Sequence, residues 1–166
     1  VHEEKALQIF EELGDLPGIL LLAINLGVQA YADGRWDEAV ALYTKAQDVA
    51  RRSGNVSGEG AAAANLGEVL ISRGQLGEAE VLLQEARRVL RGQKVVGCAL
   101  FAETQLGRLA MERGDTEAAV EALNAVIDEA IHLGFNLSLG PLALADQMGI
   151  DVVLQQLDAL SRHLGD

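Results

Sequence analysis

Residues 65–86 read NLGEVLISRGQLGEAEVLLQEA, and this stretch decides the fold because it recurs on both sides of itself. The stretches 25–46 and 105–126 align with it without a gap, so the pattern returns every 40 residues. Repetition at such a period is typical of stacked helical units. We therefore predict an all-α protein built from repeated antiparallel helical hairpins.

Two runs of apolar residues at helical spacing make up each unit. In the second unit the first run ends at Gly74, and the second run extends from Ala79 to Leu90. A glycine closes a helix because it adopts the left-handed backbone conformation freely. The same landmark recurs at Gly34 and Gly114. A further shared position holds three glycines and one exception, namely Gly14, Gly54 and Gly134, with Lys94 as the exception.

Other residues mark where helices begin and where they cross. Asp15 is placed to cap the first helix of the first unit, ahead of Pro17, and Asp115 to cap the second helix of the third unit. A glycine inside a helix costs roughly 1 kcal/mol relative to alanine. Three such glycines in register therefore indicate a close helix crossing, and we expect small residues opposite them. The glycines are Gly27, Gly67 and Gly107, and the expected partners are Ala39, Ala79 and Ala119.

The landmarks together resemble the tetratricopeptide repeat. In the first unit they run Leu26-Gly27, Gly34, Ala39, Tyr43 and Ala46, and the other two units repeat them. The period of 40 residues exceeds the usual length of about 34, but the spacing inside the hairpin is the ordinary one. The resemblance implies a right-handed α-solenoid, similar to the repeat regions of bacterial signalling proteins. These include adenylate or guanylate cyclase-associated proteins, NTPases and LuxR-type regulators.

We interpret the whole chain, 1–166, as a single repeat domain. Residues 1–14 match the second helix of a unit, so we expect a half repeat there and further protein upstream. The segment after the third unit lacks the landmarks and is expected to cap the last apolar face. The predicted divisions are 1–14 (half repeat), 15–54, 55–94 and 95–134 (three repeats) and 135–166 (irregular capping helices).

Composition excludes several classes of function. The chain has 13 basic and 25 acidic residues and a net charge of −12, so we expect no direct binding of nucleic acid. No apolar run is long enough to span a bilayer, so we expect no membrane partner and a cytoplasmic protein. The three histidines show no metal-ligand spacing, and no nucleophile or phosphate-binding motif occurs. We expect no enzyme activity, catalytic residue, metal or cofactor in this chain.

The resemblance places the first helix of each unit on a concave face, where a protein or peptide would bind. Amides at 25, 65 and 105 both donate and accept hydrogen bonds. They suit a bound peptide backbone and the bracing of neighbouring helices equally well. Arg108 would pair with a ligand carboxylate or, as we favour, with Glu68 or Glu112. The predicted concave-face residues are Asn25, Tyr31, Asn65, Glu68, Phe101, Gln105 and Arg108.

Three classes of function follow from this face. The favoured one is a protein- or peptide-binding scaffold, the regulatory segment of a larger bacterial signalling protein. The second is structural self-association, with a homodimer formed through the exposed helix at residues 1–14. The third is a small-molecule sensor with its ligand near Tyr31, Ile71 and Phe101. A clamp for chaperone tails is disfavoured because Ile24 and Ala64 stand where lysines would be expected.

Overall fold

The computed structural model describes residues 2–135 together with residues 142, 143, 146 and 149. Over these residues the chain forms seven α-helices and no strand, which confirms the all-α prediction. The helices are α1 (His2–Leu13), α2 (Leu16–Ala32), α3 (Trp36–Ser53), α4 (Val56–Ser72), α5 (Leu76–Gly92), α6 (Val96–Glu112) and α7 (Thr116–Phe135).

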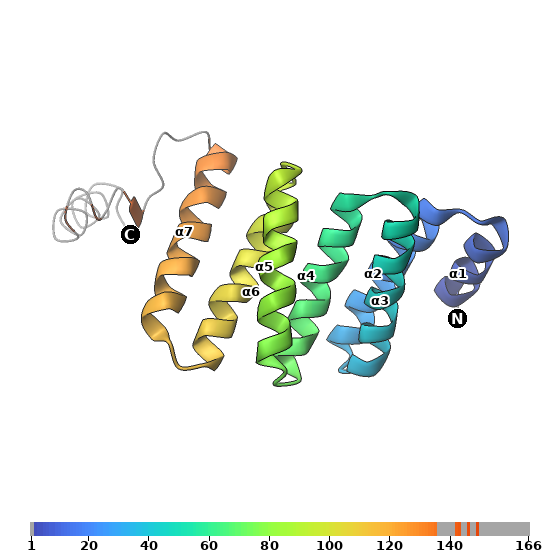
Figure 1. Ribbon diagram of the computed structural model, residues 1–166, viewed down its shortest axis with the longest axis horizontal. Coiled ribbons are helices and arrows are strands. Elements are labelled where there is room, and N and C mark those ends of the chain that lie inside the picture. Colours follow the sequence, from blue (N-terminus) through green and yellow to red (C-terminus); the bar gives the residue numbers. More distant parts are fainter. Residues whose placement is uncertain (1, 136–141, 144–145, 147–148, 150–166) are drawn as a thin grey trace, which may run out of the picture.

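The helices form antiparallel hairpins stacked in one row, with α1 at its N-terminal end (Figure 1). α2 pairs with α3, α4 with α5 and α6 with α7, and neighbouring hairpins meet where α3 packs on α4 and α5 on α6. The first helices also touch one another, α2 with α4 and α4 with α6, whereas α3, α5 and α7 do not. The first helices therefore line the inner face of the row and the second helices its outer face.

Two helices are capped by the side chains that the sequence predicts for this role. Asp15 accepts a hydrogen bond from the backbone N–H of Gly18 at 3.1 Å, and Asp115 accepts one from Ala118 at 3.1 Å. Asn55 caps α4 in the same way. Each cap satisfies one of the backbone donors that a helix start leaves unpaired.

Residues with a left-handed backbone conformation separate the helices at the predicted glycines, except at Gly134. Gly34 and Gly114 have φ values of 75° and 78°, and Lys94 takes the same conformation at 59°. Lys94 thus has the same backbone conformation as Gly14 and Gly54, although this conformation is unfavourable for a residue with a side chain. Gly134 differs, because α7 continues through it to Phe135. No chain reversal therefore occurs at Gly134.

Three glycines inside the first helices contact large side chains of the second helices. We had expected alanines at these contacts. A Cβ on Gly27 would lie 2.5 Å from the ring of Tyr43, and one on Gly67 would lie 2.6 Å from Leu83. Gly107 faces Leu123 in the same way, at 2.8 Å. The alanines at 39, 79 and 119 are buried nearby. Each glycine thus makes room for a side chain of the second helix that lies one turn after the alanine, namely Tyr43, Leu83 or Leu123.

Small residues dominate the core along the row. Its largest fully buried side chains are Tyr43, Leu83, Leu90 and Val69, and most of the remaining buried residues are alanines. Alanine at a helix contact lets two backbones approach closely, as the aromatic-poor composition requires. Cys98 is half-buried and packs at the edge of this core.

The predicted capping helices at 135–166 lie outside the described residues, apart from Phe135, the end of α7, and four later positions. At two of these, the backbone N–H groups of Leu142 and Ala143 each donate to the Asp128 carboxylate at 2.7 Å. Asp128 therefore connects α7 to the chain that follows it.

Candidate peptide-binding face

Side chains from three first helices meet on the inner face of the row. Arg108 of α6 donates from Nη2 to the Ser72 hydroxyl of α4 at 3.0 Å and from Nη1 to the Tyr31 hydroxyl of α2 at 3.3 Å. The two hydroxyl oxygens are 2.9 Å apart. One guanidinium therefore connects all three repeats.

Glu68 and Gln105 extend this cluster toward the hairpin interiors. The Gln105 amide donates to Glu68 Oε1 at 3.2 Å, and Arg108 Nη1 lies 4.0 Å from the same oxygen. Burial raises the pKa of Glu68, although Arg108 and the Gln105 hydrogen bond both act to lower it. Gln105 is buried, and its carbonyl oxygen accepts no hydrogen bond within the described part of the chain. The cluster thus holds a charged pair, Arg108 and Glu68, beside a buried amide whose carbonyl oxygen has no partner there.

Two other predicted residues line a small hollow between α4 and α6. Asn65 and Phe101 lie on its wall beside Ala61, Gly97 and Cys98, and its volume is about 190 Å³. The Asn65 amide donates to the carbonyl of Ala61 on its own helix at 2.9 Å. The hollow is therefore mostly apolar, with one amide at its rim.

The structure brings together most, but not all, of the predicted residues. Tyr31, Glu68, Gln105 and Arg108 form the inner-face cluster. The remaining three stand apart from it, and among them Asn25 is exposed and its side chain forms no hydrogen bond within the described residues. The amides of Asn25, Asn65 and Gln105 do not hydrogen-bond one another, since Asn65 bonds to its own helix and Gln105 bonds to Glu68. The favoured pairing of Arg108 with the protein's own Glu68 is confirmed.

Ser72 belongs to the cluster but was missing from the predicted set. Its repeat-equivalent positions hold Ala32 and Glu112, so the alignment of the units gives it no common character. Its only signal is a polar side chain on the face that Tyr31 and Arg108 share.

The described residues contain neither a group of three metal-ligating side chains nor a membrane-spanning helix. No three His, Cys, Asp or Glu side chains among them are grouped to hold a metal ion. Among the same residues, no helix has the length and apolar character needed to cross a bilayer.

Two family models match separate parts of the chain. Residues 18–92 match the tetratricopeptide repeat, so this part of the chain is a tetratricopeptide-like helical repeat. Repeats of this kind generally mediate protein–protein interaction. Residues 107–166 match the C-terminal domain of 3-hydroxyacyl-CoA dehydrogenase. This second match begins inside the third predicted repeat and was not foreseen from the repeat pattern.

Two curated relatives agree with the second match. A 3-hydroxybutyryl-CoA dehydrogenase of Clostridioides difficile is 52% identical over 40 residues. A probable 3-hydroxybutyryl-CoA dehydrogenase of Bacillus subtilis (strain 168) is 50% identical over 40 residues. Each alignment covers 24% of this chain and only 14% of the relative. The likeness is thus to a short piece of those proteins.

Proposed function

We propose that the inner face of the row binds a protein or peptide segment, and that the chain is an interaction scaffold. The observation that carries this proposal is the convergence of Tyr31, Ser72 and Arg108 from three separate helices. Arg108 is about one-third exposed, so its guanidinium remains within reach of a bound partner. The hollow beside Phe101 would take one apolar side chain of the same segment.

A peptide selection followed by titration tests the proposal. A random 12-residue peptide library is displayed on phage, and a selected peptide is titrated against the protein and its variants by calorimetry. We expect Asn65→Ala and Arg108→Ala to weaken binding by about tenfold each, as loss of a charge-assisted or buried hydrogen bond does. Arg52→Ala on the outer face, which removes an exposed charge, is the matched control. Affinity unchanged in both inner-face variants contradicts the model.

The cellular setting is also a proposal. The resemblance supports a right-handed superhelix within a larger cytoplasmic signalling protein, of the adenylate or guanylate cyclase-associated, NTPase or LuxR type. The acidic net charge argues against direct binding to nucleic acid. The flanking sequence of the native gene product is the test, since a catalytic or DNA-binding domain there would establish the setting.

Self-association through α1 is a second candidate. Leu13 is 74% exposed and Ile9 is 54% exposed, while Phe10 packs against α2. Such an apolar face favours a homodimer in which two α1 helices cover each other. Sedimentation equilibrium of Ile9→Glu/Leu13→Glu beside the parent chain tests this. A parent chain that sediments as a monomer removes the candidate.

The size of the inner hollow gives less support to a small-molecule sensor. Sites that enclose a drug-sized ligand measure about 300–1,000 Å³, and the hollow beside Phe101 is smaller, at about 190 Å³. Ile71, expected near the ligand, is buried in the core.

The dehydrogenase likeness supports a further candidate, confined to residues 107–166. We propose that this part of the chain binds a 3-hydroxyacyl-CoA thioester, without turnover by the chain alone. We propose binding without turnover because the family match spans only a C-terminal domain and the alignment covers only 14% of the relative. Calorimetric titration with 3-hydroxybutyryl-CoA, beside free CoA and NAD⁺-reduction assays, is the test. No heat of binding from the thioester contradicts this candidate and leaves the peptide-binding proposal intact.

A further inference from the structure

A continuous groove runs between α5 and α7 on the outer face, with α6 as its floor. It consists of two hollows of about 300 and 280 Å³ that share Arg87, Leu106 and Ala122. We call it the α5–α7 groove. Its lining includes small apolar side chains, since alanines of α7 line both hollows and Ala110 of α6 lines one of them. This groove faces away from the inner-face cluster, because α5 and α7 are second helices.

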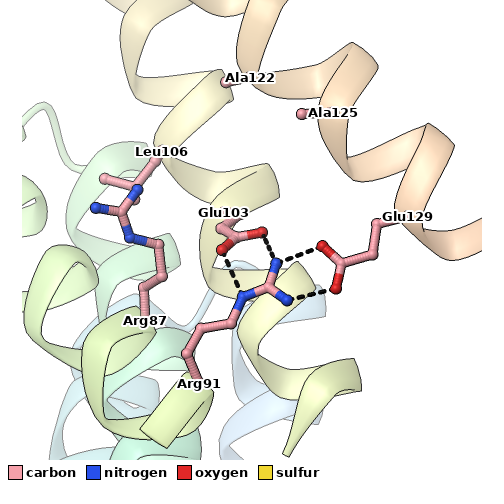
Figure 2. A pocket seen from close by; sticks show the side chains of 7 residues that line it. All are labelled: Arg87, Arg91, Glu103, Leu106, Ala122, Ala125 and Glu129. Carbon is pink, nitrogen blue, oxygen red and sulfur yellow. Dashed lines mark hydrogen bonds and ion pairs between the residues drawn. The ribbon is translucent and has the colours of Figure 1, made fainter. Parts of the chain in front are cut away.

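Fixed ion pairs occupy both ends of the α5–α7 groove. At one end Arg91 lies between Glu103 and Glu129, with two hydrogen bonds to each carboxylate (Figure 2). The hydrogen bonds from Arg91 hold the pKa of Glu129 below its usual value. At the other end Arg113 lies 2.8 Å from Glu80. Both arginines at the ends are thus already paired within the protein, and the two carboxylates around Arg91 leave that end with an excess of negative charge.

Arg87, in the middle of the groove, differs from every other described arginine. Its side chain forms no hydrogen bond or ion pair within the described residues, and no interaction reaches its guanidinium in Figure 2. All the others lie within 4.0 Å of a carboxylate, the arginines being Arg35, Arg51, Arg52, Arg73, Arg88, Arg91, Arg108 and Arg113. In a chain with about twice as many acidic as basic residues, this exposed guanidinium is left available to a partner.

We propose that the α5–α7 groove is a second interaction surface, which binds an otherwise neutral protein segment through one carboxylate paired with Arg87. The guanidinium fork matches a carboxylate with two parallel hydrogen bonds. Leu106 and the alanines that line the groove contact small apolar side chains of the bound segment, on either side of its carboxylate. A polyacidic segment does not fit, because Glu80 and Glu103 at the two ends would repel additional carboxylates.

Nuclear magnetic resonance on the whole chain tests the proposal directly at Arg87. The probes are three end-blocked heptapeptides of alanine and leucine, with one central glutamate, one central glutamine or three glutamates. The Arg87 Nε–H resonance is assigned by its absence from Arg87→Gln. We expect the single-glutamate peptide to shift this resonance and to bind at least about tenfold more tightly than the other two.

Arg88→Gln is the matched control, because it removes the same charge from the next residue of α5. Arg88 is exposed and pairs with Glu85 on its own helix, at 2.5 Å. We expect Arg87→Gln to abolish the preference for glutamate and Arg88→Gln to preserve it. Arg108→Ala should also preserve it, which separates this surface from the inner face. Equal binding of the glutamate and glutamine peptides, equal loss in both variants, or no shift at Arg87 at millimolar peptide overturns the proposal.

Discussion

The hydroxyl of Tyr31 in α2 lies 2.9 Å from the hydroxyl of Ser72 in α4, although 41 residues separate them in the chain. The hydroxyl of Tyr43, on the partner helix of the same hairpin, is buried and has no hydrogen-bond partner within the described residues. Burial therefore raises the pKa of Tyr43 well above its usual value. The two tyrosines offer a direct comparison of a paired and an unpaired hydroxyl.

Removal of these two hydroxyls should have opposite effects. Tyr31→Phe loses bonds to Ser72 and Arg108, so we expect the free energy of unfolding to fall by about 1 kcal/mol. Tyr43→Phe removes an unpaired buried polar group and should leave stability unchanged or raise it by up to about 1 kcal/mol. Urea denaturation followed by circular dichroism measures both. An equal loss in the two variants would show that Tyr43 has a partner after all.

Gly67→Ala should destabilise the array at the crossing of α4 and α5. The added Cβ would lie 2.6 Å from two atoms of Leu83, whose side chain is fully buried in the core. Overpacking of this kind costs about 1–3 kcal/mol. Gly77→Ala in α5 is the control, since its Cβ would meet nothing within 4 Å. We expect the control to be neutral or stabilised, because alanine is the better helix former. Thermal melts of both proteins decide the matter.

Lys94→Gly should stabilise the protein. Lys94 has a φ of 59°, and glycine occupies the equivalent turn at Gly54 with a φ of 68°. A left-handed conformation costs a side-chain-bearing residue about 1 kcal/mol, which glycine avoids. Lys94→Ala separates this backbone effect from loss of the lysine, since alanine keeps the Cβ. We expect the denaturation midpoint to rise for the glycine variant alone, and a rise in both would point to the charge instead.

Two carboxylates should shift the pH dependence of stability in opposite directions. Burial raises the pKa of Glu68 in the folded protein, so the folded state binds more protons than the unfolded chain above its ordinary pKa of 4.5. Stability from this group is therefore gained as pH falls toward 4.5. Hydrogen bonds from Arg91 lower the pKa of Glu129, so its contribution is present above 4.5 and is lost on acidification.

The measurement compares Glu68→Gln and Glu129→Gln with the parent chain by urea denaturation at several pH values between 7.5 and 4. Relative to Glu68→Gln, the parent should become more stable as pH falls. Relative to Glu129→Gln, it should become less stable over the acidic end of the range. The same slope for both differences would contradict the assigned environments.

Local signals made the helical array predictable. The landmarks from Leu26 to Ala46 recur every 40 residues, and Asp15, Asp115 and Gly34 act within a few residues of their own position. Helix starts, chain reversals and apolar stripes depend on such short-range effects. α7 departs from this pattern, since it continues through Gly134, a position by which earlier helices have ended.

The two proposed binding surfaces could be recognised only from the tertiary structure. Arg108 and Tyr31 are 77 residues apart, and only the stacking of three hairpins brings their side chains to 3.3 Å. Arg87 and Arg88 are neighbours in sequence, yet one lines the α5–α7 groove and the other pairs on its own helix. The sequence by itself therefore determined the repeated hairpins, because their signals are local and periodic. Packing alone decided which residues meet between repeats, because the side chains that differ from unit to unit carry no periodic signal.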